Sequence, residues 1–243
     1  MTDALLVAGV FVIAGLIKGA VGIGLPTVVV GLLSIAMPPA QAAQLMVLPA
    51  LATNFWQMMA GPALGELLRR LAGFIVAVFL GTFATIGFMT TSALASAVLG
   101  AVLAAYGAYG LWGRRYHIEA QAERRLSPLV GLLTGMLSGA TGVFVIPTMP
   151  YLTSLRLNAE ELVQAVGIVA FVCPLALGVA LAVRGQYPAA AAGASFLALL
   201  PALAAMYVGM RIRRRLPAAT FMRWFFTALI ALGGYMFFRA AFR

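Results

Sequence analysis

The sequence predicts an all-α polytopic membrane protein, on the basis of its composition, the length of its apolar segments and a repeated glycine pattern. Of the 243 residues, 63% are hydrophobic and only 9% are charged, and the mean hydropathy is +1.04. A water-soluble chain of this length could not bury so much apolar surface. Because apolar runs recur along the whole chain, we expect a single membrane domain over residues 1–243.

About eight hydrophobic segments approach the length of a membrane span, for which about 20 residues suffice. They run near 4–36, 40–60, 71–91, 94–112, 128–153, 160–183, 187–210 and 218–240. As one straight helix the first would be ~50 Å long, well beyond the ~30 Å hydrocarbon core. The stretch "GLIKGAVGIGLP" contains the interruption, because its glycines lower helix stability and its proline removes an amide donor. We expect the break at Gly22–Pro26.

The glycine pattern of the first segment recurs in the fifth. At a constant offset of 120 residues (135 minus 15, for example), G-x3-G-x2-G occurs at Gly15, Gly19 and Gly22 and again at Gly135, Gly139 and Gly142. Two copies in register indicate an internal duplication, as in many transporters. We therefore predict a first repeat over 1–112, a basic loop over 113–127 and a second repeat over 128–243, whose first segment is also broken at its glycine motif.

Arginine positions favour inverted over parallel repeats. If each broken segment is a hairpin that enters and leaves by one face, eleven arginines share one side of the membrane and three lie on the other. The eleven are Arg69, Arg70, Arg114, Arg115, Arg124, Arg125, Arg156, Arg211, Arg213, Arg214 and Arg215, and the three are Arg184, Arg239 and Arg243. The positive-inside rule then predicts that both termini lie outside the cytoplasm.

The start of the sixth segment carries a helix-capping signal. In "NAEE", Asn158 is followed three residues later by Glu161, which is a variant of the capping box. We expect a helix to begin directly after Asn158.

Composition also excludes several functional classes. The formal net charge is +10, but the arginines cluster beside apolar segments, so we expect cytoplasmic loops and no nucleic-acid partner. Cys173 is the only cysteine and lies in an apolar run, and His117 is the only histidine and lies in the basic loop. This argues against a thiolate or histidine metal site and against an intramembrane catalytic base. We expect no cofactor, no metal and no enzymatic activity.

Lys18 is the leading candidate for a functional residue. A lysine within a membrane segment costs ~2.5–3.5 kcal/mol on insertion scales, so a role in function is the default interpretation. It could contact an anion, or it could snorkel to an interface or pair with an acidic side chain. All six acidic residues lie at segment ends or in loops, namely Asp3, Glu66, Glu119, Glu123, Glu160 and Glu161.

The helix breaks define the rest of the candidate site. A break inside the membrane requires a surrounding cavity or protein, and the free amides at a helix N-terminus attract anions. Hydroxyl and amide side chains near the breaks could donate to a substrate oxygen or serve the structure alone. The predicted substrate-binding residues are Lys18, Gly19, Gly22, Gly24, Thr27, Gln44, Asn54, Gln57, Ser138, Gly139, Thr141, Gly142 and Gln164.

Two stretches resemble the TauE/SafE sulfite exporter family of membrane proteins. They are "GLIKGAVGIGLPTVVVGLL" (15–33) and "GMLSGATGVFVIPTMPYL" (135–152), and the likeness covers both halves. The resemblance implies export of sulfite or of small organosulfur anions such as sulfonates. The first copy departs from the family pattern, because Lys18 stands where the second copy has Ser138 and because Leu25 and Pro26 follow Gly24.

We therefore predict a multi-pass transporter of the bacterial inner membrane that exports sulfite or a short organosulfonate by alternating access. Its partners are the anion and the lipid bilayer, and its apolar outer helices allow a homo-oligomer. An anion channel of the same architecture and a non-transporting membrane scaffold are the alternatives. Because no buried Asp, Glu or His relay is visible, we expect export to follow the substrate gradient and the membrane potential.

Overall fold

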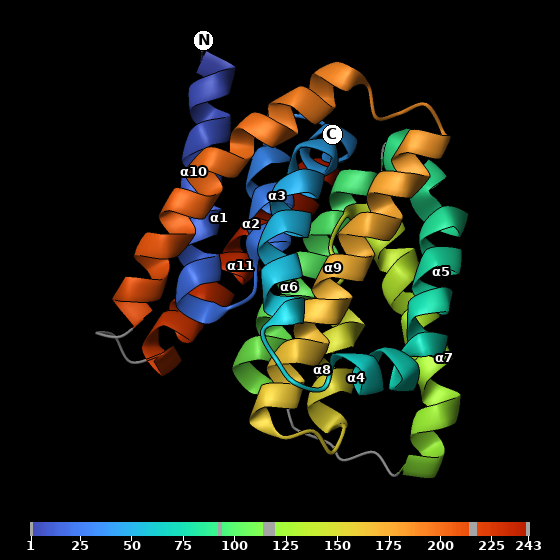
Figure 1. Ribbon diagram of the computed structural model, residues 1–243. Helices are drawn as coiled ribbons and strands as arrows, with labels where there is room; N and C mark the ends of the chain where they lie inside the picture. Colours follow the sequence, from blue (N-terminus) through green and yellow to red (C-terminus); the bar gives the residue numbers. More distant parts are fainter. Residues whose placement is uncertain (1, 92–93, 114–119, 214–217, 242–243) are drawn as a thin grey trace.

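The computed structural model describes residues 2–91, 94–113, 120–213 and 218–241, and these form eleven α-helices (Figure 1). The helices are α1 (Thr2–Val21), α2 (Leu25–Leu33), α3 (Pro39–Met59), α4 (Leu64–Arg70), α5 (Ala72–Thr91), α6 (Ala95–Trp112), α7 (Ala120–Thr141), α8 (Val145–Ser154), α9 (Ala159–Val183), α10 (Ala189–Arg213) and α11 (Ala218–Ala241). His117, Arg114, Arg115, Glu119, Arg214, Arg215 and Arg243 lie outside these ranges.

The predicted all-helical membrane class is confirmed at the level of helices. Among the described residues, α1, α5, α6, α9 and α10 are long and apolar enough to cross a membrane. Eleven helices replace the eight predicted segments, because the first and fifth are each divided in two and because α4 forms in the connection after α3. The capping box is confirmed, since Asn158 Oδ1 accepts from the Glu161 amide at 2.9 Å and Glu161 Oε2 accepts from the Asn158 amide at 3.0 Å.

Both divided segments change direction at glycines. Between α1 and α2, Gly22 and Gly24 have φ of 87° and 105°, and between α7 and α8 Gly142 has φ of 75°. Side-chain-bearing residues rarely adopt this left-handed region. Pro26 was predicted within the break, but it lies in the first turn of α2, where a helix does not need its missing amide.

The two helix pairs point toward opposite ends of the bundle. In Figure 1 the N-terminus and the α2–α3 connection lie at one end, whereas the start of α7 and the α8–α9 connection lie at the other. The most extensive helix contacts are α5 with α7, α1 with α10, α6 with α11, and α3 with α9. Each of these pairs joins a helix from the first half of the chain to one from the second.

Small residues bring two of these pairs close together. A Cβ atom on Gly15 or Gly19 would overlap the carbonyl oxygens of Ala202 or Met206 in α10. A Cβ on Gly139 of α7 would lie 2.5 Å from the Thr82 carbonyl oxygen of α5. Glycines at such positions allow two membrane helices to pack backbone against backbone.

An ion pair fixes the short helix α4 to the start of α7. Arg70 Nε donates to Glu123 Oε1 at 2.6 Å, and Arg70 Nη2 donates to Glu123 Oε2 at 2.8 Å. This bidentate geometry is stronger than a single contact, and the hydrogen bond to Glu123 is the main reason that the pKa of Arg70 is raised. Because the pKa of Arg70 is higher in the folded than in the unfolded protein, the ion pair contributes its full stabilisation at any pH below the unfolded pKa. This stabilisation is lost only when the pH rises through the folded pKa, so it is constant around neutral pH.

We expect Arg70→Ala to lower the free energy of unfolding by about 1–2 kcal/mol, more than an exposed ion pair would. The pair is largely buried, with side-chain exposures of 29% and 11%, so the substitution leaves the Glu123 carboxylate without its partner. Thermal unfolding in detergent measures the effect. Arg69→Ala is the matched control, since Arg69 is exposed and, among the residues that the structure describes, bonds only to the Gly65 carbonyl of its own helix. Equal destabilisation by both variants would contradict the assignment.

Candidate functional site

Lys18 is buried near the end of α1, with 5% of its surface exposed. Its Nζ donates to Asn54 Oδ1 at 2.5 Å and to Gln57 Oε1 at 2.6 Å. In the described part of the chain Lys18 forms no ion pair, so two neutral amide oxygens solvate its ammonium. Such oxygens satisfy donors but do not cancel the charge, and an ammonium has three donors. Among the described residues, two of the three N–H groups of Lys18 have a hydrogen-bond partner and the third has none.

The two amides are held in place by α9. Asn54 Nδ2 donates to the Ala170 carbonyl at 2.9 Å, and Gln57 Nε2 donates to the Val163 carbonyl at 3.2 Å. Because each NH2 group is directed at a backbone acceptor, each amide oxygen is left to face Lys18. The site thus connects α1, α3 and α9.

Both helix breaks meet beside Lys18 at a cavity of about 20 Å³. Its lining comes from the first break, the second break and the facing helices, and comprises Lys18, Ile23, Gly24, Pro26, Asn54, Phe144, Val145, Thr148, Met149, Val166, Val169 and Ala170. A volume of this size holds about one water molecule. The N-terminal ends of α2 and α8 therefore lie close to the same ammonium group.

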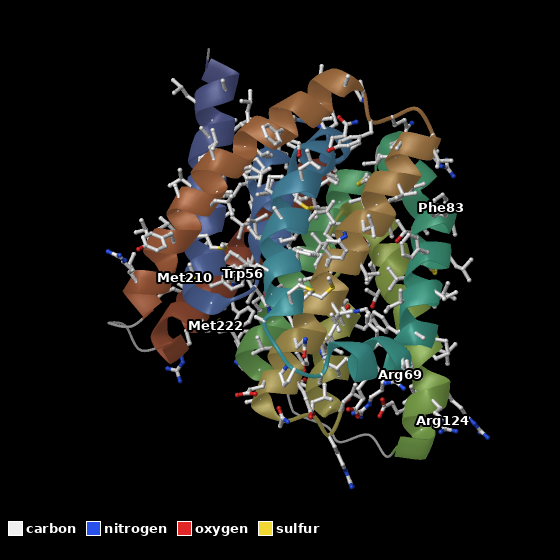
Figure 2. All side chains as sticks on the ribbon, viewed as in Figure 1. Trp56, Arg69, Phe83, Arg124, Met210 and Met222 are labelled. Carbon is white, nitrogen blue, oxygen red and sulfur yellow. The ribbon has the colours of Figure 1, made fainter. Side chains whose placement is uncertain are left out.

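A larger cavity, of about 510 Å³, shares Lys18, Ile23, Met149 and Val166 with the small one. It is lined by Lys18, Gly19, Ala20, Val21, Gly22, Ile23, Thr53, Trp56, Gln57, Ala60, Met149, Leu162, Val163, Val166, Met206, Met210, Ile212 and Met222. Figure 2 shows Trp56, Met210 and Met222 gathered near the ends of α3 and α10 and the start of α11. No Asp or Glu is among these described lining residues, so Lys18 gives the cavity a positive charge.

Of the predicted residues, the structure brings Lys18, Gly19, Gly22, Gly24, Asn54 and Gln57 together around these two cavities. The space beside the Gly22 backbone is open at the large cavity, because no atom lies within 4 Å of the position that a Cβ would take. Asn54 and Gln57 are three residues apart in α3 and so lie on the same face of that helix. The amide oxygens of both side chains accept hydrogen bonds from Lys18.

Gln44 and Gln164 line neither cavity. Gln44 Nε2 donates to the Gln186 carbonyl at 2.7 Å. Gln164 is 1% exposed; its Nε2 donates to the Met58 and Gly61 carbonyls, and its Oε1 accepts from the Ala63 amide. Gln164 thereby satisfies partly buried backbone groups at the end of α3 and the start of α4.

We expect Gln164→Leu to reduce the free energy of unfolding by about 1–3 kcal/mol, because three partly buried backbone groups lose their hydrogen-bond partner. The anion affinity of the folded fraction should stay within about twofold, since Gln164 touches neither cavity. Unfolding and binding assays on one preparation separate the two effects. Gln41→Leu, at an exposed position of α3, is the control; a large loss of affinity in Gln164→Leu alone would show a role in binding.

The remaining candidates are not among the lining residues of either cavity. Thr141 Oγ1 donates to the Leu137 carbonyl at 2.7 Å and accepts from the Val143 amide at 3.1 Å, which closes the turn at the second break. Gly139 packs against α5, and a Cβ on Gly142 would lie 3.2 Å from Val30 of α2. Thr27 and Ser138 are buried, and neither hydroxyl has a hydrogen-bond partner among the described residues.

Several lining residues carry no signal in the sequence. Met149, Met206, Met210 and Met222 have the same apolar character as lipid-facing positions, and the location of Trp56 near a segment end is typical of an interfacial anchor. Only the three-dimensional arrangement distinguishes them from ordinary membrane-facing residues. Thr148 differs, because its hydroxyl beside the second break made it a candidate in the sequence; it lines the small cavity, and its hydroxyl donates to the Phe144 carbonyl at 2.6 Å.

Comparison with known protein families gives one match. The family model described as "Sulfite exporter TauE/SafE" covers residues 7–236, a range that includes both helix breaks and every residue of the two cavity linings. Searches of curated proteins and of solved structures found no match to the chain.

Proposed function

The chain belongs to the sulfite exporter TauE/SafE family, whose members are membrane transporters and not enzymes, and from this premise we propose that it exports a small anion, sulfite or a short organosulfonate, by alternating access. The observation that carries the proposal is the buried ammonium of Lys18, which lies between two helix breaks and is bonded only to amide oxygens in the described part of the chain.

The surroundings of Lys18 favour an anion for physical reasons. Attraction between opposite charges is much stronger in a partly desolvated site than in water. The start of α2 adds the positive end of its helix dipole beside Lys18. Because the small cavity there holds about one water molecule, the anion itself would bind on the side of Lys18 that borders the large cavity. An anion held here would take the third N–H of Lys18 and would neutralise a charge that is costly in the membrane.

The helix contacts support two inverted repeats. Shifting α2 by 120 residues gives 145–153, which coincides with α8 (Val145–Ser154), and the same shift relates α1 to α7 and α3 to α9. The 120-residue shift also relates α5 to α10, so the contact of α1 with α10 in one repeat corresponds to the contact of α7 with α5 in the other. The contacts of α3 with α9 and of α6 with α11 each join two corresponding helices. Interleaved repeats of this kind place a substrate site where both halves meet.

We place the arginine-rich end of the bundle in the cytoplasm and both termini outside it. Figure 2 shows Arg69 and Arg124 together at the end opposite the N-terminus, and the positive-inside rule assigns such an end to the cytoplasm. The large cavity includes Met210 and Ile212 on either side of Arg211. In this orientation it is the path by which an anion reaches Lys18 from inside the cell.

The proposal is tested by efflux from proteoliposomes loaded with sulfite or with methanesulfonate. Without a pH gradient we expect efflux, and we expect an inside-negative potential to accelerate it, since that potential favours anion exit by about 2.3 kcal/mol per charge per 100 mV. Protein-free liposomes are the control. No efflux above that control would refute the transport proposal, and efflux that requires an imposed proton gradient would refute the proposed driving force.

A further inference from the structure

We infer that the large cavity binds the apolar tail of an organic monoanion whose charged head is held at Lys18, so that the preferred substrates are amphiphilic anions such as alkanesulfonates of several carbons. This inference rests on the proposed function and narrows its substrate class. It starts from the size of the cavity, about 510 Å³, which falls within the ~300–1,000 Å³ of pockets for drug-sized organic molecules. Sulfite, with one sulfur and three oxygens, would leave most of it unfilled.

The lining combines one cation with a mainly apolar surface. Lys18 and Gln57 supply polar groups beside the first helix break. Most of the other described lining residues are apolar, including Leu162, Val163 and Val166. A fully hydrated inorganic anion has no favourable contact with such a surface, whereas each methylene that leaves water there is stabilised.

Methionine is frequent in the apolar part of the lining. Met149, Met206, Met210 and Met222, four of the chain's 12 methionines, line this one cavity. Their unbranched, polarisable side chains adapt to ligands of different shape, and Trp56 adds a large flat surface. This composition suits a flexible tail of variable length better than a rigid ring with fixed polar groups.

Charge complementarity restricts the head to an anion. Lys18 is the cation of the lining, and no Asp or Glu is among the described residues that form it. A zwitterion would therefore bring a positive group that finds no carboxylate partner.

The test titrates methanesulfonate, propanesulfonate and hexanesulfonate into the protein in nanodiscs of zwitterionic lipid. Trp56 fluorescence reports occupancy in a background of Trp112→Phe and Trp224→Phe. We expect affinity to rise about fourfold per methylene, the equivalent of ~0.8 kcal/mol per buried CH2. The double variant Met210→Ala, Met222→Ala should flatten this dependence, and Met136→Ala, at an exposed methionine of α7 outside the cavity, should leave it as in the parent protein.

Each other outcome is decisive. Equal affinity across the series would overturn the tail site and leave the proposed export of small anions standing, whereas failure to bind any of these sulfonates or sulfite would overturn both. A chain-length dependence that persists in Lys18→Met would show insertion into the bilayer and would refute a head group at Lys18. Displacement of hexanesulfonate by phosphatidylglycerol added to the disc would refute a soluble ligand.

Discussion

Lys18→Met should reduce anion affinity and transport by roughly 30-fold or more while the protein still folds. Loss of one partner of a buried, hydrogen-bonded charge contact costs about 2–5 kcal/mol, and 2 kcal/mol corresponds to about 30-fold. Methionine keeps the length and apolar stem of the side chain, so packing against α3 is largely preserved. Asn54 and Gln57 lose a donor, but removing a buried ammonium also removes its desolvation cost.

Lys18→Arg is the matched control because it retains the positive charge. We expect it to keep anion affinity closer to that of the parent protein than methionine does, with transport measured by efflux and affinity by titration in the same nanodiscs. If Lys18→Met transported sulfite at the parental rate, the ammonium would have no part in binding, and a structural role in joining α1 to α3 would remain.

Gly15→Leu should prevent stable folding, whereas Gly9→Leu in the same helix should be tolerated. At Gly15 a Cβ would overlap the Ala202 carbonyl oxygen of α10, and this clash is with backbone, so rotation of a side chain cannot relieve it. Overpacking costs about 1–3 kcal/mol and more when the backbone must move. At Gly9 nothing lies within 4 Å of the added atom.

The measurement is the monodisperse fraction after size-exclusion chromatography in detergent, together with the midpoint of thermal unfolding. We expect Gly15→Leu to lose most of the monodisperse peak and Gly9→Leu to match the parent protein. Similar behaviour of both variants would mean that α1 and α10 do not pack through this glycine, and the contact between the two halves would then have to be assigned differently.

The ends of the broken helices follow from local chemistry. Glycines at 22 and 24, followed by a proline, destabilise a helix wherever they stand, and α1 ends at Val21. Asn158 and Glu161 likewise determine the start of α9 through their own contacts. Such features depend on neighbours a few residues away, and for that reason the sequence alone was sufficient to locate them.

Features that depend on distant contacts could not be predicted in this way. Gln164 was a candidate for the binding site, but its hydrogen bonds hold a connection about 100 residues earlier in the chain. Gly139 likewise belonged to the predicted site and instead packs against α5. Met210 and Met222 resemble lipid-facing residues in sequence, and only the packing of α10 against α1 and α3 and of α11 against α1 and α2 places them at one cavity.

The most direct test of the anion site is a structure of the protein in a membrane mimetic with selenite in place of sulfite, located by anomalous scattering from selenium. We expect a selenium peak beside the Lys18 ammonium, where a selenite oxygen can accept a hydrogen bond from it and the large cavity provides room for the anion. A peak found only beside the arginines at the end of the bundle, with Lys18 still bonded to Asn54 and Gln57, would contradict it.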